Sequence, residues 1–106
     1  MSEVPPAVQR MIEATNSGDS AAFVAAFTPD AVLVDWGKAF EGREEIGGWN
    51  ESDNIGRQAH FEIVDVVAED AVWIVTLEVS GGGFNGESGF RFELADDLIS
   101  RMEIQP

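Results

Sequence analysis

The sequence predicts a single α+β domain in which helices come first and strands follow. Apolar residues recur at helical spacing near the amino terminus, and they alternate with polar residues in the second half of the chain. A length of 106 residues fits one domain, and an apolar share of 44% is that of an ordinary globular protein. Helices followed by strands indicate an antiparallel meander with one face covered by the helices.

Two helices are expected before the first strand. The first starts at Pro5 and Pro6, because proline is tolerated in a first helical turn, and it ends at residues 16–18. Its apolar stripe consists of Val8, Met11, Ile12 and Thr15. Asp19 or Ser20 caps the second helix, which residues 28–30 terminate. That second helix carries Phe23, Val24 and Phe27 on one side.

The rest of the chain alternates strands and turns after one more helix. Residues 31–36 form a strand, and Gly42 precedes a short third helix with Ile46 and Trp49 three residues apart. Residues 50–56 are polar and are expected to form a loop. Strands then follow at residues 60–67 and 71–79, around Phe90 and Phe92, and at residues 98–104. Residues 80–88 form a glycine-rich connection, and residues 95–97 form a tight turn.

Charge and composition exclude several classes of function. The formal net charge of −14 disfavours nucleic acid and anionic membranes as partners, because both are bound through Lys and Arg. The chain has no cysteine and one histidine, so we expect no disulfide, no Cys-bound zinc and no histidine metal site. The acidic cluster Asp65, Glu69 and Asp70 lacks the spacing of a 12-residue calcium loop, so we expect no metal there either. No apolar run approaches membrane-spanning length, and the acidic, proline-containing amino terminus lacks the pattern of a secretory signal. We therefore expect a cytoplasmic protein.

The order of elements resembles the nuclear transport factor 2-like fold over nearly the whole chain, residues 1–106. The phrases NSGDSAAFVAAFTPDAVLVD and FEGREEIGGW are similar to the helix–helix–strand opening and the third helix of that family. The resemblance implies a cone of helices closing over a curved sheet, with a pocket between them. It specifies function poorly, because the fold hosts isomerases, cyclases, dehydratases, epoxide hydrolases and proteins that catalyse nothing.

Ketosteroid isomerase is the most informative comparison within that family. The resemblance places Asp35 at the position of that enzyme's general base, at the end of the first strand. The enzyme's oxyanion tyrosine falls on Met11, and its second oxyanion donor, an aspartic acid, falls near Arg91. The position of the base is kept and the two donors are not. The resemblance therefore does not imply ketosteroid isomerisation by the familiar mechanism.

Three residues are candidates for catalysis. Asp35 could act as a general base in an apolar pocket, or it could simply mark the point where the strand reaches water. His60 could share a substrate proton with Asp35, or it could lie on the outer face of its strand or be hydrogen-bonded in the core. Arg91 and Glu93, two apart in one strand, resemble the Arg–Asp pair of limonene epoxide hydrolases, but a solvated or dimer-facing row would show the same pattern.

The sequence thus leaves two classes of function open. The protein could be a cofactor-free isomerase, cyclase or hydrolase that acts on a small apolar molecule, with Asp35 as base. It could instead be a non-catalytic small-molecule-binding or dimerisation domain. The residues expected to contact a bound molecule are Met11, Trp36, Trp49, Phe61 and Met102. We also expect a homodimer through the open face of the sheet, where alternation offers Val75, Leu77, Phe90 and Phe92.

Overall fold

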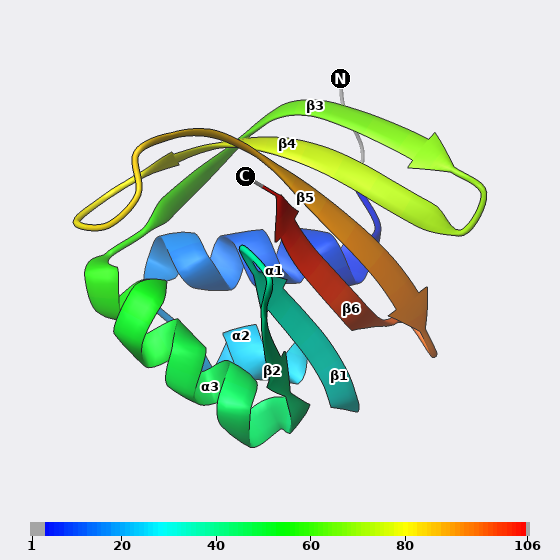
Figure 1. Cartoon of the computed structure of the whole chain (residues 1–106), viewed down its shortest axis with the longest axis horizontal. Helices are drawn as coiled ribbons and strands as arrows, with labels where there is room; N and C mark the ends of the chain where they lie inside the picture. Colours follow the sequence, from blue (N-terminus) through cyan, green and yellow to red (C-terminus); the bar gives the residue numbers. More distant parts are fainter. Residues whose placement is uncertain (1–3, 106) are drawn as a thin grey trace.

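The computed structural model describes residues 4–105 and shows helices packed against a strongly curved sheet (Figure 1). Helix α1 (Pro6–Ser17) begins with proline at its first position and ends at Gly18, whose φ of 74° is the left-handed conformation that suits a helix cap. Its buried side carries Ala7, Val8, Met11, Ile12, Ala14 and Thr15. Helix α2 (Ser20–Ala25) is capped by the Asp19 carboxylate, which accepts a hydrogen bond of 3.0 Å from the Ala22 N–H. The prediction of both helices is confirmed.

The end of α2 differs from the prediction. Strand β1 (Phe27–Asp35) begins at Phe27, so Phe27 and the 28–30 segment belong to a strand and not to the end of the helix. The pairing of β1 shifts in register between Phe27 and Val32. This irregularity accommodates Pro29, which has no N–H to donate to a neighbouring strand.

Two further elements were missed or shortened in the prediction. Strand β2 (Lys38–Glu41) pairs with β1 through a two-residue turn, and its four residues are too few to show clear alternation. Helix α3 (Gly42–Asp53) continues through residues 50–53, which were expected to be a loop. Residues 50–53 are polar, so contacts with other elements, and not an apolar stripe, keep them in the helix. The short 3₁₀ helix η1 (Ile55–Arg57) follows it.

The sheet has the strand order β2-β1-β6-β5-β4-β3 within the described residues. The remaining strands are β3 (His60–Glu69), β4 (Val72–Ser80), β5 (Gly86–Ala95) and β6 (Leu98–Gln105). Their consecutive pairs are antiparallel, as expected for a meander. The β1–β6 pair is parallel, which corrects the expectation of a wholly antiparallel sheet. It is parallel because the meander starts at the far edge and brings its last strand back beside β1.

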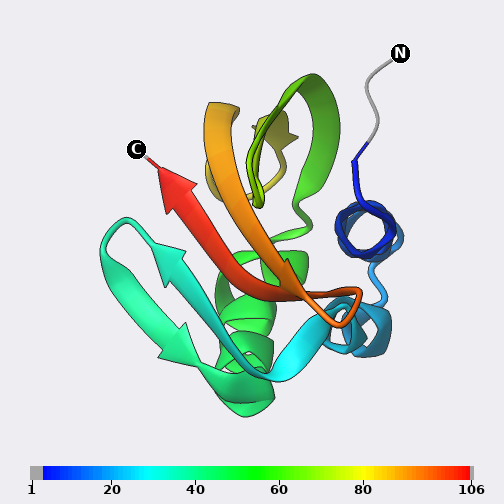
Figure 2. The same ribbon diagram turned by 90° about the vertical axis from the view of Figure 1, so that its right-hand side faces the viewer.

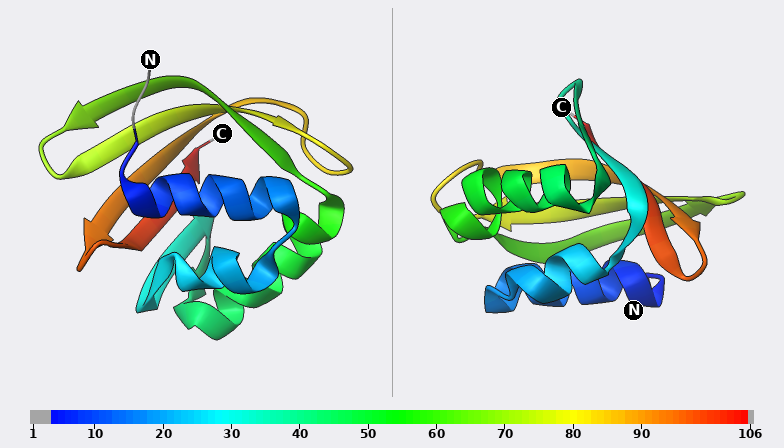
Figure 3. Two further views of the ribbon diagram at one scale, coloured as in Figure 1. Left: turned by 180° about the vertical axis from the view of Figure 1, so that it is seen from behind. Right: turned by 90° about the horizontal axis from the view of Figure 1, so that it is seen from below.

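The curvature of the sheet creates the space in which a site can form. Figure 2 shows the sheet bending between the β1–β2 hairpin and the β3–β4 hairpin, which form its two ends. The left view of Figure 3 shows α1 lying across the sheet, with α2 and α3 below α1. The concave face supplies the core, which includes Leu33, Phe61, Phe92 and Met102.

The apolar residues proposed for the open face of the sheet lie on the concave face instead. Val75, Leu77, Phe90 and Phe92 are all buried in the core. The packing of the concave face against the helices therefore buries all four of these alternating side chains, and they do not form an exposed dimer surface. In the part of the chain that the structure describes, no helix has the length and apolar character needed to cross a membrane.

Candidate functional site

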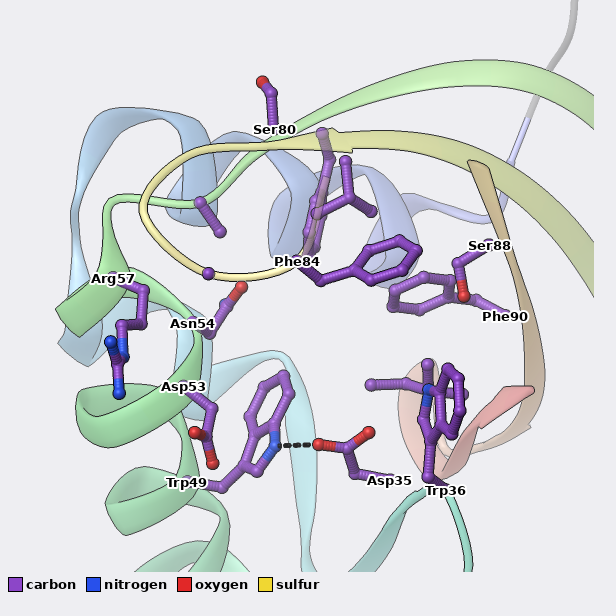
Figure 4. Close-up of a pocket in the computed structure, with 15 residues that line it drawn as sticks. Asp35, Trp36, Trp49, Asp53, Asn54, Arg57, Ser80, Phe84, Ser88 and Phe90 are labelled. Atoms are coloured by element: carbon purple, nitrogen blue, oxygen red, sulfur yellow. Dashed lines mark hydrogen bonds between the residues drawn. The ribbon is translucent and has the colours of Figure 1, made fainter. Parts of the chain in front are cut away.

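A pocket of about 230 Å³ opens between the β1–β2 turn, the end of α3 and the β4–β5 loop (Figure 4). An engineered cavity of about 150 Å³ holds benzene, so this pocket can accommodate a ring with a short substituent. Its walls are mainly aromatic and aliphatic. The lining residues used below are Asp35, Trp36, Trp49, Asn54, Phe84, Ser88 and Phe90.

The Asp35 carboxylate is fixed at the mouth of this pocket by one hydrogen bond. The Trp49 indole N–H donates to Asp35 Oδ2 over 2.9 Å, as Figure 4 shows. Asp35 is the last residue of β1, and Trp49 lies on the buried side of α3, where its ring stacks at 6.1 Å from Phe23. The indole satisfies one carboxylate oxygen, and the other oxygen remains available to a ligand.

Trp36 stands beside Asp35 in a strained turn. The turn that joins β1 to β2 consists of Trp36 and Gly37, with φ values of 50° and 89°. Both residues of a tight hairpin turn of this kind need positive φ, and Asn-Gly is its usual sequence. Tryptophan in this conformation is rare, and its side chain is 61% exposed. The turn therefore holds a large aromatic ring at the mouth of the pocket.

Phe84 faces the pocket from the β4–β5 loop. The Asn85 side chain closes this loop on itself by donating to Gly81 O at 3.0 Å and Gly83 O at 3.1 Å. Gly82 N–H donates to Arg57 O at 2.8 Å, which ties the loop to η1. A side chain at Gly81 would meet the Gln58 carbonyl oxygen at 2.6 Å, so the glycine permits this close approach. The segment predicted to be a glycine-rich connection thus forms a wall of the pocket.

A buried polar network fixes the opposite wall, at the end of α3. Asn54 Nδ2 donates to Thr15 Oγ1 at 3.1 Å and to Asn50 Oδ1 at 3.0 Å. Asn50 Nδ2 in turn donates to Ser20 Oγ at 3.1 Å. Asn50 and Asn54 are 0% and 1% exposed, so these bonds satisfy groups that water cannot reach freely. The network joins α3 to both α1 and α2.

The structure brings together part of the predicted site. Asp35, Trp36, Trp49 and Phe61 all line the pocket. Met11 and Met102 are fully buried in the core and are not among the lining residues. Their side chains are packed between α1 and the sheet, so they support the pocket only indirectly.

His60 and Arg91 do not reach Asp35. His60 is exposed at the start of β3 and lines a separate hollow with the end of α1. Phe61, its neighbour, takes the inward position because side chains alternate along a strand. Arg91 lies between the inward-facing Phe90 and Phe92, so the same alternation places it on the outer face, opposite Glu103 of β6.

Sequence reasoning missed Asn54, Phe84 and Ser88 as pocket residues. Asn54 lay in a segment predicted to be a loop, and Phe84 and Ser88 lay in the glycine-rich connection. A single large aromatic residue among four glycines was the one available signal in that connection.

The fold of the chain agrees with comparisons to known proteins. The SnoaL-like domain model matches residues 8–102. A candidate polyketide cyclase from Sinorhizobium meliloti is 26% identical, with a TM-score of 0.84 over 96% of this chain and 95% of that one. A candidate ketosteroid isomerase from Kribbella flavida is 14% identical, with a TM-score of 0.79 over 94% of this chain and 74% of that one.

A designed protein has the same fold. A computationally designed 17-OHP binder is 16% identical, with a TM-score of 0.85 over 99% of this chain and 92% of that one. A search of curated proteins finds no significant match. The family model spans most of the chain, from α1 to β6, and the solved structures share the nuclear transport factor 2-like architecture. The chain therefore belongs to the SnoaL-like domain family.

Proposed function

We propose that the protein binds a small, largely apolar organic molecule in the Asp35 pocket, and that Asp35 acts on it as a general base in a cofactor-free reaction. The hydrogen bond from Trp49 to Asp35 carries this proposal, because it orients a carboxylate toward an aromatic pocket. A base must lie within hydrogen-bond reach of the proton it removes, and a fixed carboxylate meets that need. Isomerisation, cyclisation and hydrolysis can each begin with such a step.

The relatives support an organic ligand. A candidate polyketide cyclase, a candidate ketosteroid isomerase and a designed 17-OHP binder share the fold. Pockets for such ligands are concave and mostly apolar, with a few placed polar groups. The Asp35 pocket has this composition, since aromatic rings surround one oriented carboxylate.

A second candidate function is binding without catalysis. It is favoured by the absence of His60 and Arg91 from the pocket, because neither can stabilise negative charge that develops on a substrate beside Asp35. In this case Asp35 is a polar anchor for the ligand and transfers no proton.

Hydrogen–deuterium exchange separates the two functions without knowledge of the natural substrate. The α-protons of 2-indanone, a small bicyclic ketone, exchange in D2O when a base removes them, and proton NMR follows the loss. General-base catalysis predicts exchange above the buffer rate with the unmodified protein and background exchange with Asp35→Asn. Asp97→Asn is the matched control, because Asp97 lies in the β5–β6 turn and its φ of 63° suits asparagine. Equal rates for the protein and Asp35→Asn would contradict the proposed catalysis.

We further propose that the protein forms a homodimer through the outer face of the sheet. On that face Arg91 lies opposite Glu103 and Glu93 lies opposite Arg101, between partly buried aliphatic side chains of β1 and β4. A second copy can set the arginines of one sheet against the glutamates of the other. Light scattering should give twice the chain mass of 11.5 kDa, and Arg91→Glu should give the monomer mass. A monomer mass for the unmodified protein would contradict this proposal.

A further inference from the structure

Three of the polar side chains that line the Asp35 pocket offer acceptors to a ligand, while their own donors are already used. The Trp49 indole N–H is spent on Asp35, and the Ser88 hydroxyl donates to the Gln105 carbonyl at 3.1 Å. The two N–H groups of the Asn54 amide are spent on Thr15 and Asn50. Together with Asp35, these side chains leave a ligand one carboxylate oxygen of Asp35, the lone pairs of Ser88 and the amide oxygen of Asn54.

The orientation of the Asn54 amide follows from the network that holds it. The Thr15 hydroxyl donates to the Met11 carbonyl at 3.0 Å, so its oxygen must accept from Asn54. Asn50 Oδ1 is an acceptor as well, because Asn50 uses its nitrogen on Ser20. Asn54 must therefore point its nitrogen into the network and its oxygen away from it.

That oxygen faces the pocket. It accepts no hydrogen bond from the described residues, although Asn54 is 1% exposed. Every fully enclosed side-chain nitrogen or oxygen of residues 4–105 has a hydrogen-bond partner. Because the Asn54 oxygen has none, it is not fully enclosed, and it meets the open space of the pocket. Figure 4 shows it directed toward the β4–β5 loop that carries Phe84. An acceptor that reaches the open space of a pocket and accepts no hydrogen bond from the described residues is available to a ligand that donates hydrogen bonds.

The charge around the pocket favours a cation. Asp35 and Asp53 contribute carboxylates to the lining, and Arg57 contributes the only lysine or arginine side chain there. The Arg57 guanidinium is turned along α3, where its Nε donates to the Ser52 carbonyl at 3.1 Å (Figure 4). The net charge of −14 further raises the local concentration of cations.

The aromatic walls suit the same ligand. The rings of Trp36, Trp49, Phe84 and Phe90 lie around the space near the Asp35 carboxylate (Figure 4). Aromatic faces attract organic cations, and the attraction grows when water is excluded. Trp36 and Phe84 are 61% and 52% exposed, so a ligand between them would cover two large apolar side chains.

We infer that the ligand of this pocket is a protonated amine carried on a small ring system. The ammonium group donates N–H bonds to Asp35 and Asn54, and its apolar body packs against the aromatic walls. This inference rests on the proposed ligand-binding role of the pocket and is independent of whether Asp35 also removes a proton.

A matched set of three probes tests the inference. 2-Aminoindane, 2-indanol and indane-2-carboxylate share one bicyclic body and differ in a cationic, a neutral and an anionic group. Isothermal titration at low salt should show the amine binding at least about tenfold more tightly than the alcohol, and no binding of the carboxylate. Asp35→Asn should remove most of the preference for the amine over the alcohol, and Asp97→Asn should keep it.

Each other result overturns the inference. Equal or tighter binding of the alcohol or the carboxylate would show that the pocket does not select a cation, and the proposed function would stand. Failure of all three probes to bind at millimolar concentration would also overturn it. Equal amine preference in Asp35→Asn and Asp97→Asn would assign the preference to the overall charge and not to this site. The exchange of 2-indanone protons tests catalysis separately, so the two failures are distinguishable.

Discussion

Trp36 combines a backbone φ of 50° with a side chain that is 61% exposed. Neither feature helps the fold, since strain costs on the order of 1 kcal/mol and an exposed ring buries little apolar surface. Residues held in sparsely populated backbone conformations cluster at active sites and ligand-binding sites. Trp36 thus supports the assignment of the pocket independently of Asp35.

Replacing this residue should separate stability from binding. Trp36→Asn creates the Asn-Gly turn that suits the conformation, so we expect the free energy of unfolding to rise by about 1 kcal/mol. The same change removes an aromatic wall, so 2-aminoindane should bind several-fold more weakly. Urea unfolding and calorimetric titration measure the two effects. A loss of stability in Trp36→Asn would show that the ring supports the fold.

The Trp49 indole N–H has a role that its ring does not share. Trp49→Phe keeps an aromatic side chain and removes the donor to Asp35, which should lower the free energy of unfolding by about 1–3 kcal/mol and weaken amine binding. Trp73→Phe is the matched control, because Trp73 is half-buried on β4 and does not line the pocket. Equal effects of the two substitutions on amine binding would argue against a positioning role for Trp49.

At the scale of elements, one side chain ties β3 to α1. Asn16 donates to the Phe61 carbonyl at 2.9 Å and accepts from the Phe61 N–H at 2.7 Å. This pair of bonds holds Phe61 at the pocket wall, beyond the end of the helix. Asn16→Ala should lower the free energy of unfolding by about 1–3 kcal/mol, because both backbone groups lose their partner. Glu13→Ala, exposed on the same helix, should change it by less than about 0.5 kcal/mol. Denaturant unfolding of both variants checks the difference, and equal losses would contradict it.

A second clamp holds α3 to β1. The Arg43 guanidinium donates to the Phe27 carbonyl from Nε at 3.0 Å and from Nη2 at 2.7 Å. Arg43 lies in the FEGREEIGGW phrase on which the family resemblance rests. Its two hydrogen bonds to Phe27 explain in structural terms why an arginine stands at this position of the phrase. Arg43→Met keeps much of the aliphatic stem and should cost about 1–3 kcal/mol of stability in thermal or urea unfolding. An unchanged free energy of unfolding would contradict this prediction and would show that water replaces the Arg43 hydrogen bonds to the Phe27 carbonyl without loss.

The elements that the sequence predicts well are those with clear periodicity or caps. The stripe of α1, the Asp19 cap and the alternation of β4 and β5 are local signals, and the structure confirms them. Strand β2 is too short to show alternation, although it follows β1 directly, and the last turn of α3 depends on Thr15, a partner distant in sequence. The parallel β1–β6 pair likewise depends on the path of the whole meander.

The residues of the candidate site were likewise predictable only where a local sequence signal marked them. The end of β1 and its place in the family layout indicated Asp35, and helical spacing indicated Trp49. Alternation along single strands did not show which face of β3 or β5 is inward until the sheet was assembled, so His60 and Arg91 stayed ambiguous. The acceptor role of Asn54 depends on hydrogen bonds between three helices, which no local pattern contains.

For the whole molecule, the net charge of −14 on 106 residues has consequences for stability and binding. Like charges repel in the compact state, and salt screens them over about 10 Å at 0.1 M ionic strength. We expect the melting temperature to rise by a few degrees on going from very low to physiological salt, and amine binding to weaken over the same range. Calorimetry and titration in sodium chloride measure both. A falling melting temperature would contradict net repulsion.

The three tryptophans allow the central claim to be tested in a single titration. Trp36 and Trp49 line the pocket, whereas Trp73 does not. The indole N–H proton signals, assigned by the Trp→Phe variants, can be followed by NMR while 2-aminoindane is added. The account predicts that the Trp36 and Trp49 signals shift with one saturation curve and that the Trp73 signal stays in place. Saturable movement of Trp73 alone, or no movement of Trp49, would contradict the assignment of this pocket as the ligand site.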